Sequence, residues 1–188
     1  RLTSLVGLEA CTRLQELTLE VGGDTDISAV SALHSLRFLT LKASGLTEIP
    51  NLVRCTALEE LTILDANFTE LPAWVTQLPR LRTLSIRAPL KSLPTSIGQL
   101  HSLESLSISR SQLVALPETV GGLEHLVELS IEGERRKPHP LAFLPDSVGS
   151  LQRLQVLKLP NSQLQSVPVS LGRASSLNSI DLSGAPLE

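Results

Sequence analysis

The sequence has no methionine and no tyrosine, and aromatic residues make up 2% of its 188 residues. A chain of this length is long enough to bury the core of one medium-sized domain. Leucine supplies most of the apolar side chains, so such a core requires a repetitive arrangement in which like aliphatic side chains stack. The shortage of aromatic residues therefore predicts internal repeats.

Other absences narrow the possible functions. The net charge of −3 gives no reason to expect nucleic acid or an anionic membrane as the main partner. No apolar run approaches the roughly 20 residues of a membrane span, and no signal peptide is visible at Arg1. We expect a protein partner and a monomer, and the sequence leaves the cellular location open.

Catalytic and metal-binding patterns are also absent. The four histidines do not fall in a zinc or protease motif, and no glycine-rich phosphate loop follows a strand and opens a helix. His34 and His101 occupy the same position three repeats apart, on the order of 15 Å from each other. We expect no enzyme activity, no metal and no cofactor within this segment.

One motif, Leu-x-x-Leu-x-Leu/Ile, recurs along the whole chain. It begins at Leu14, Leu36, Leu58, Leu81, Leu103, Leu126, Leu154 and Leu177. The successive intervals are 22, 22, 23, 22, 23, 28 and 23 residues. The last two apolar residues of each motif alternate at period two, so both point to the same face of a strand.

A second signal follows six of the eight predicted strands. It reads "EIP", "ELP", "SLP", "ALP", "FLP" or "SVP", and four copies continue as "LPTSIGQL", "LPETVGGL", "LPDSVGSL" and "VPVSLGRA". The proline favours leaving the strand in a tight turn, and Gly98, Gly121, Gly149 and Gly172 recur at one position, as a close backbone turn requires.

The 22–23-residue pattern "LPxxIGxLxxL" resembles that of leucine-rich repeat proteins over the entire chain. The resemblance implies an α/β solenoid shaped like a horseshoe, with a parallel concave sheet of about eight strands. The convex side would carry 3₁₀, short helical or extended segments. We interpret residues 1–188 as a single leucine-rich repeat domain of a longer protein, because the chain begins halfway through a repeat and ends after the eighth motif.

The chain departs from the family at the turn position, three residues after the last strand leucine, where asparagine or cysteine is usual. Here the sequence has Gly22, Ser44, Ala66, Pro89, Ser111, Glu134, Ser162 and Ala185. Without an asparagine ladder, the buried backbone groups of the turns need other partners, such as the three serines or water. Cys11 and Cys55 share an inward position two repeats apart, roughly 10 Å, which exceeds the reach of a disulfide and indicates small core fillers.

A solenoid of this kind offers its concave sheet as an interaction surface, and three columns of outward residues can be followed from strand to strand. The hydroxyl column is Thr18, Thr40, Thr62, Ser85, Ser107, Ser130, Lys158 and Asp181. The leading column is Glu16, Phe38, Glu60, Thr83, Ser105, Glu128, Val156 and Ser179. The trailing column is Glu20, Lys42, Leu64, Arg87, Ser109, Glu132, Pro160 and Ser183.

The hydroxyl column favours side chains that pair along neighbouring strands, although it could also form a polar floor for a protein ligand. The two outer columns vary more, as recognition requires. Candidate contact residues on or beside them are Phe38, Lys42, Leu64, Arg87 and Arg110, because exposed aromatic and arginine side chains are common in binding hot spots. Isolated exposed apolar residues are also normal on any protein surface, so both interpretations stay open.

The sixth repeat carries five additional residues. From the first strand leucine to the leucine of "LP", most repeats have 13 residues, whereas Leu126 and Leu144 are 18 apart. The extra residues therefore fall between the strand and the convex turn. Arg135, Arg136 and Lys137 lie in this insertion. Alignment of "LAFLP" with "LVALP" places Phe143 where other repeats have a solvated residue, so Phe143 should be exposed or covered only by the insertion. A tolerated loop and a basic, aromatic partner-binding loop are the two hypotheses.

The overall pattern predicts a protein–protein interaction module that uses its concave face and the inserted basic loop. "LRTLSIRA" and "LPTSIGQLHSL" resemble the repeat domains of plant-pathogen type III effectors, including effector ubiquitin ligases, in which the repeats select a host protein. That resemblance implies a virulence protein secreted by a bacterium into the host cytoplasm. The alternatives are a cytoplasmic signalling scaffold similar to Ras-binding leucine-rich repeat proteins and a receptor-type ligand sensor.

Overall fold

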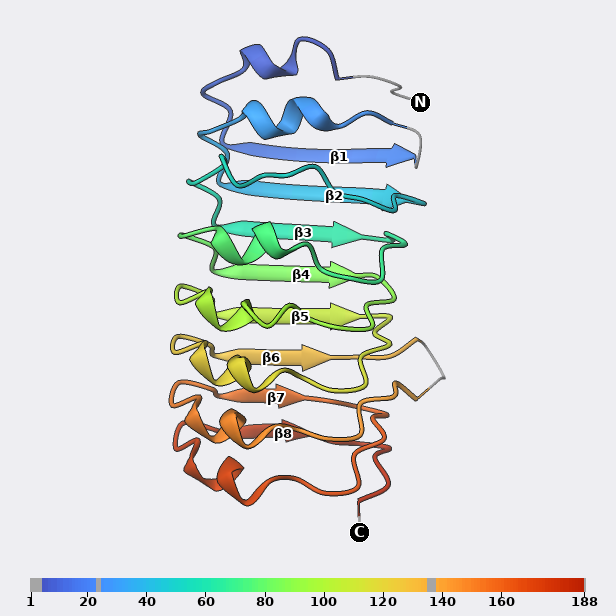
Figure 1. Cartoon of the computed structure of the whole chain (residues 1–188), viewed down its shortest axis with the longest axis vertical. Helices are drawn as coiled ribbons and strands as arrows, with labels where there is room; N and C mark the ends of the chain where they lie inside the picture. The colour runs from blue at the N-terminus through green and yellow to red at the C-terminus, as the bar shows by residue number, and fades with distance from the viewer. Residues whose placement is uncertain (1–4, 23–24, 135–137, 188) are drawn as a thin grey trace.

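The computed structural model describes residues 5–22, 25–134 and 138–187. Within them, eight strands form one parallel sheet, and their order in the sheet is their order along the chain (Figure 1). The strands are β1 (Glu16–Gly22), β2 (Phe38–Ser44), β3 (Glu60–Leu64), β4 (Thr83–Arg87), β5 (Ser105–Ser109), β6 (Glu128–Ile131), β7 (Val156–Lys158) and β8 (Ser179–Asp181). Every recurrence of the leucine motif forms a strand, which confirms the predicted leucine-rich repeat solenoid.

Short 3₁₀ helices cover one face of this sheet and form the convex side (Figure 1). In the described part of the chain they are η1 (Leu8–Ala10), η2 (Ser28–Ala32), η3 (Ala73–Gln77), η4 (Ile97–Gln99), η5 (Glu118–Gly122), η6 (Asp146–Ser150) and η7 (Val169–Arg173). A proline with extended backbone immediately precedes η3, η5, η6 and η7. The fixed φ of proline thus starts the convex turn, as the "LP" signal predicts.

The second repeat differs from the others on the convex side. The segment that connects β2 to β3 forms no helix and follows an irregular path (Figure 1). Its sequence is one residue shorter than in the next repeat, since Ile49 and Leu58 are 9 positions apart and Leu71 and Leu81 are 10 apart. Length alone does not account for the missing helix, because Ile27 and Leu36 are also 9 positions apart and η2 forms between them.

The core is a continuous stack of aliphatic side chains between the sheet and the convex helices. The inward residues of the strands, among them Leu39, Leu61, Leu84, Leu106 and Leu129, are almost fully buried. Identical leucines contact one another in successive repeats, which explains how a core with so few aromatic residues can be filled.

The recurring glycines have a different cause from the predicted turn. None of Gly98, Gly121, Gly149 and Gly172 has a positive φ. Instead, a Cβ atom at Gly149 would collide with the carbonyl oxygen of Ser170 in the next repeat. Glycine is needed there because successive convex helices pack closely.

Neighbouring turns are joined directly by their backbones. Hydrogen bonds run from Asn67 N to Leu46 O (2.9 Å), from Gln112 N to Leu90 O (2.8 Å) and from Gln163 N to Leu141 O (3.0 Å). Of the three turn serines, Ser111 accepts a hydrogen bond from Leu113 N (3.1 Å). The side-chain oxygen of Ser162 is buried without a partner, so its predicted bonding role was wrong.

The insertion shifts the turn position of the sixth repeat. His139, rather than Glu134, forms the bridge with Ser162, and its backbone nitrogen donates to Asn161 O (3.0 Å). Glu134 is exposed. The prediction that Glu134 fills this position was therefore wrong, because the five extra residues precede the turn and the regular register resumes only at His139.

The two cysteines differ in burial, and the prediction that both fill the core was half wrong. Cys55 is fully buried, with its Sγ 3.7 Å from Val30 O, and burial raises the pKa of its thiol. Cys11 is exposed. Among the described residues, Cys11 has a neighbouring repeat on one side alone, whereas Cys55 is enclosed by repeats on both sides.

Candidate protein-binding surface

The leading and hydroxyl columns of the concave sheet lie in register across all eight strands, whereas the trailing column is paired only from β1 to β3 and between β4 and β5. Leading-column pairs run without interruption from Glu16–Phe38 in β1 and β2 to Val156–Ser179 in β7 and β8. The hydroxyl column is aligned over the same eight strands. In the described residues, its hydroxyls give one side-chain hydrogen bond, from Ser130 to Glu132 (3.5 Å). The column is therefore a row of packed small side chains rather than a hydrogen-bonded ladder.

Phe38 is half-buried, and its ring is held by its neighbour. The guanidinium carbon of Arg37 lies 5.1 Å from the ring centroid, in the range of a cation–π contact. Arg37 is itself fixed by two hydrogen bonds to Glu59, of 2.9 and 3.0 Å. These bonds lower the pKa of the Glu59 carboxyl and raise that of Arg37. One face of Phe38 is thus occupied by a charged group with a fixed position.

The trailing column brings Lys42, Leu64 and Arg87 onto three successive strands. Lys42 lies opposite Leu64 in the register of β2 and β3. Lys42 and Arg87 are exposed, and Leu64 is half-buried. Arg87 is not a free cation, because its Nε lies 3.4 Å from Oδ1 of Asp65. Phe38, Lys42, Leu64 and Arg87 therefore form one surface over β2, β3 and β4, with its charge partly compensated.

Small hydroxyl side chains occupy the middle of the sheet. Thr83 and Ser85 of β4 lie opposite Ser105 and Ser107 of β5. Longer charged side chains follow on β6 and β7. There, Lys158 donates a hydrogen bond of 2.8 Å to Glu128, and this bond raises the pKa of Lys158. The centre of the concave face thus carries short, uncharged side chains, and charged side chains lie on the strands to either side of it.

Arg110 lies just beyond the end of β5, in a turn with left-handed backbone conformation (φ 57°). Asp65 and Asn161 have the same conformation after β3 and β7 (φ 61° and 55°). Arg110 lines a small cavity of about 170 Å³ together with Pro89, Pro138 and Pro140. It is thus next to the insertion, while Arg87 is at the end of the adjacent strand.

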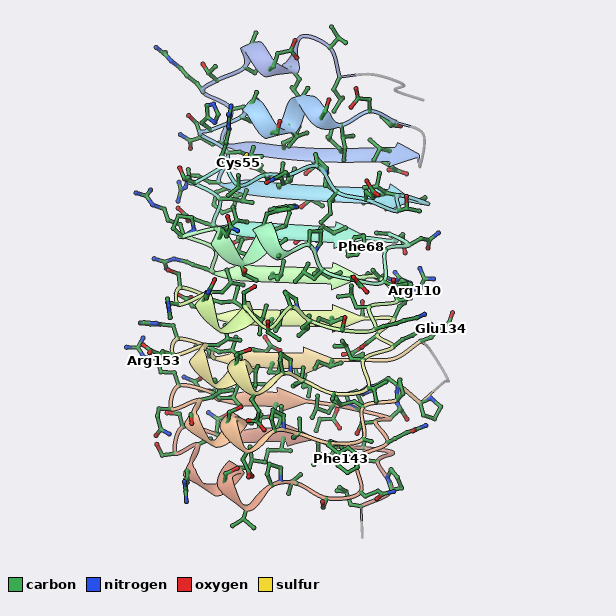
Figure 2. The ribbon with its side chains drawn as sticks, in the orientation of Figure 1. Cys55, Phe68, Arg110, Glu134, Phe143 and Arg153 are labelled. Carbon is green, nitrogen blue, oxygen red and sulfur yellow. The ribbon has the colours of Figure 1, made fainter. Side chains whose placement is uncertain are left out.

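Phe143 is 63% exposed, which confirms the prediction of an exposed aromatic side chain. It lies on the segment that follows the insertion and forms a bridge with Ala115 rather than with any strand residue. In Figure 2 it lies well apart from Glu134, at the start of the insertion, and from Arg110. Phe143 therefore belongs to a different surface from the concave columns. Arg135, Arg136 and Lys137 lie outside the described residues.

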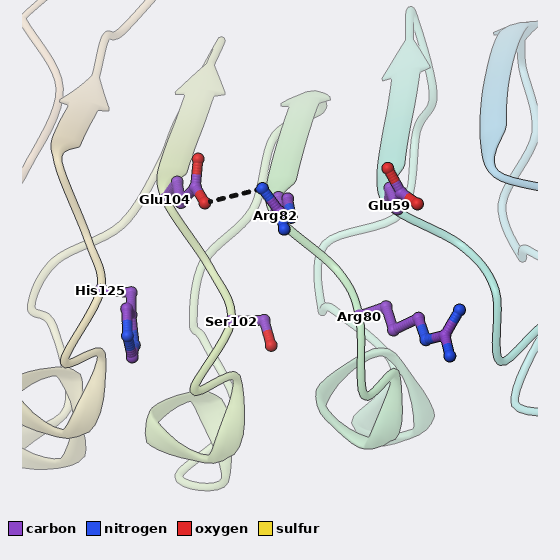
Figure 3. Close-up of a pocket in the computed structure, with 6 residues that line it drawn as sticks. All are labelled: Glu59, Arg80, Arg82, Ser102, Glu104 and His125. Atoms are coloured by element: carbon purple, nitrogen blue, oxygen red, sulfur yellow. Dashed lines mark hydrogen bonds and ion pairs between the residues drawn. The ribbon is translucent and has the colours of Figure 1, made fainter.

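The edge at which the strands begin carries a row of opposite charges. Arg82 Nη1 lies 3.3 Å from Glu104 Oε1, in the position that Arg37 and Glu59 have two repeats earlier. A shallow pocket of about 410 Å³ is lined there by Glu59, Arg80, Arg82 and Glu104, among others, and Figure 3 shows Arg80 extending away from the Arg82–Glu104 pair. Its carboxylates and guanidiniums largely balance each other, so the pocket favours no ligand of one charge.

Two further features concern the described residues as a whole. They hold no group of three or more histidine, cysteine, aspartate or glutamate side chains with the geometry of a metal site. They also include no helix with the length and apolar character of a membrane span.

Reasoning from the sequence proposed Phe38 and Arg87 as candidates but missed the residues that contact their side chains. Arg37, Glu59 and Asp65 were not among the candidate residues. A signal was present for the first pair: Arg37 and Glu59 have opposite charges at equivalent positions of successive repeats, 22 residues apart. Equivalent positions in a solenoid lie side by side, so such a pair predicts a contact.

The fold, the repeats and the concave surface together define a binding solenoid. The chain belongs to the leucine-rich repeat family, because the family model described as "Leucine-rich repeat region" matches residues 75–184. No curated protein matches the chain. A solenoid of this family is an architecture for protein–protein interaction rather than for catalysis.

Solved leucine-rich repeat structures resemble this one over nearly its whole length. One is a leucine-rich repeat protein of Leptospira interrogans (TM-score 0.77, 24% identity, 98% of this chain and 53% of that chain). Another is the ectodomain of the plant membrane receptor kinase GASSHO1/SCHENGEN3 from Arabidopsis thaliana, in complex with CASPARIAN STRIP INTEGRITY FACTOR 2 (TM-score 0.74, 25% identity, 96% of this chain and 26% of that chain). A third is the leucine-rich repeat domain of the type III effector XopL (TM-score 0.74, 24% identity, 97% of this chain and 73% of that chain). The chain thus spans about half of the first protein and about a quarter of the second.

Proposed function

We propose that this domain is the target-recognition module of a longer protein and that it binds a partner protein through the concave surface over β2, β3 and β4. The observation that carries the proposal is the fixed position of Phe38. Its ring is held by Arg37, which is bonded to Glu59. Aromatic anchors that are already ordered before binding lose little conformational entropy on association.

The other residues of this surface support the same conclusion. Lys42 and Leu64 supply a cation and an apolar side chain at the other end of β2 and β3, four residues along the strands from Phe38 and Glu60, and Arg87 with Asp65 supplies an ion pair there. A polar rim around a partly apolar centre is the usual composition of a protein–protein interface. The small side chains of β4 and β5 leave room for a protruding segment of the partner.

The finer form of the proposal is that the partner is a host protein selected for a type III effector, such as an effector ubiquitin ligase. Its support is the resemblance of "LRTLSIRA" and "LPTSIGQLHSL" to effector repeats. In this form the catalytic domain lies elsewhere in the full-length protein, and Arg135, Arg136, Lys137 and Phe143 make a second contact with the partner. A cytoplasmic scaffold would use the same concave surface without a catalytic domain.

The test is affinity measurement with partners recovered from a host lysate, comparing three variants with wild type. Phe38→Ala/Arg87→Ala should weaken binding by at least about 30-fold, as expected for the loss of a hot spot. Arg135→Ser/Arg136→Ser/Lys137→Ser removes the positive charge of the insertion and leaves His139 in place. Val169→Ser, at a convex side chain that is 98% exposed, is the control. If the concave variant binds every partner as tightly as Val169→Ser does, the proposal is wrong.

A further inference from the structure

A second pocket, distinct from the concave columns, lies between the second and third repeats. It has a volume of about 450 Å³ and is lined by residues that follow β2 and β3 on the way to the convex side. The residues that line it include Trp74, Phe68, Glu48, Glu70 and the threonines at positions 47 and 69. None of these residues belongs to the three columns of the proposed concave site.

The shape of the pocket follows from the missing helix of the second repeat. Trp74 lies on η3, and the preceding repeat has no 3₁₀ helix at the equivalent place. The indole is consequently only half-buried. Phe68, labelled in Figure 2, lines the same pocket with 6% of its surface exposed. The pocket therefore has an aromatic wall with access from solvent.

The charge of the pocket is entirely negative. Glu48 and Glu70 occupy equivalent positions of successive repeats, and both are exposed. Neither forms an ion pair with another described residue, and no lysine or arginine lines the pocket. Lys91, in the next repeat, donates its backbone nitrogen to Thr69 O (2.8 Å) but makes no ion pair with Glu70. Successive repeats lie about 5 Å apart, so one group can reach both carboxylates.

We propose that this pocket binds an arginine side chain of a protein partner. The guanidinium would stack on the indole of Trp74 and donate hydrogen bonds to Glu48 and Glu70. A planar cation with several forked donors suits an aromatic face beside two carboxylates better than the compact ammonium of lysine does. Binding would also relieve the repulsion between the two adjacent carboxylates. This site does not depend on the concave surface, since the two share no residue.

The composition of the chain allows a direct test. Trp74 is the single tryptophan and there is no tyrosine, so intrinsic fluorescence reports on this pocket alone. N-acetyl-arginine amide is titrated at constant ionic strength, with N-acetyl-citrulline amide as the neutral analogue of the same shape. We expect a saturable change with arginine, half-complete at about 1–10 mM, and none with citrulline. No saturable change, or an equal change with citrulline, overturns the proposal. Tighter binding of N-acetyl-lysine amide overturns the assignment to a guanidinium.

Matched variants separate this site from the rest of the molecule. Glu48→Gln/Glu70→Gln should weaken arginine binding at least about tenfold, because two charge-assisted hydrogen bonds are lost. Glu118→Gln, at an exposed carboxylate at the start of η5, should bind within about twofold of wild type. Phe38→Ala/Arg87→Ala should also bind as wild type does, so failure of the concave site leaves this result intact. Unchanged affinity in Glu48→Gln/Glu70→Gln, with its thermal unfolding like that of wild type, overturns the proposal.

Discussion

His139 and Ser162 lie opposite each other in a parallel bridge between the sixth and seventh repeats, and both side chains are buried without a hydrogen-bond partner among the described residues. Their backbones are tied together, since the nitrogen of His139 donates to the carbonyl oxygen of Asn161. A buried imidazole without a partner is stable only when neutral, and burial lowers the pKa of His139. The residue that resumes the regular register after the insertion is therefore sensitive to protonation.

We expect the protein to lose stability as the pH falls below about 7. The unfolded chain binds a proton at His139 near the ordinary pKa of about 6.5, whereas the folded chain does so only at lower pH. The contribution of His139 is thus fully present above the unfolded pKa and declines as the pH falls toward the folded pKa, by up to about 1.4 kcal/mol per pH unit. Urea unfolding between pH 7.5 and 5 measures it.

His139→Leu is the control for that titration. At pH 7.5 it should unfold within about 1 kcal/mol of wild type, because it replaces an unpartnered polar group by an apolar one. As the pH falls below about 6.5, its stability relative to wild type should rise steadily, because it has no imidazole to protonate. Parallel pH profiles for the two proteins would show that another group causes the loss.

The close packing of the convex helices predicts opposite effects at two equivalent glycines. Gly149→Ala should destabilise the fold by about 1–3 kcal/mol or more, because its Cβ collides with the backbone of Ser170. Gly172→Ala should be neutral or slightly stabilising, since nothing lies within 4 Å of a Cβ there. Thermal unfolding of the two variants decides the matter, and an equal loss in both contradicts the packing explanation.

The stability lost on truncating an inward strand residue should depend on the position of its strand in the sheet. Leu106→Ala removes a side chain that is 0% exposed in β5 and should cost about 2–5 kcal/mol. Ile180→Ala changes the equivalent residue of β8, which is 50% exposed, and should cost less than about 1.5 kcal/mol. Denaturant unfolding of the isolated domain gives both values. Comparable losses would mean that Ile180 is covered in solution.

The two thiols should react at very different rates. Cys11 is exposed and should be alkylated by iodoacetamide in the native protein, while Cys55 should react only after unfolding. Burial both blocks access to Cys55 and raises its pKa, and the thiolate is the reactive form. Mass spectrometry after labelling, with and without urea, should count one and two modified cysteines, respectively. Two in the native protein would contradict the buried position of Cys55.

The repeat made most of the fold predictable from sequence. A fixed interval places equivalent residues side by side, so strand order, register and the inward leucines all follow from the same pattern. Departures from the interval were harder to interpret. The extra residues before His139 were located correctly, but their effect on the turn position was not, because the alignment by distance from the strand assigned that position to Glu134.

The candidate surface was predictable only in part, because its character depends on side-chain pairing. The outward columns identified Phe38, Lys42, Leu64 and Arg87 from alternation alone. Alternation does not show that Arg37 lies against Phe38 or that Asp65 neutralises Arg87, since both contacts depend on rotamers. The pocket beside Trp74 was missed for another reason: it requires a repeat without a helix next to a repeat with one.

The missing helix between β2 and β3 also bears on curvature. On the concave side, hydrogen bonding holds neighbouring strands about 4.8 Å apart in every repeat. On the convex side, the spacing depends on the bulk of whatever is stacked there, and an extended segment is thinner than a 3₁₀ helix. The arc should therefore be straighter around β2 and β3 than farther along, so a partner docked on these two strands would meet a flatter surface than one docked on β5 and β6.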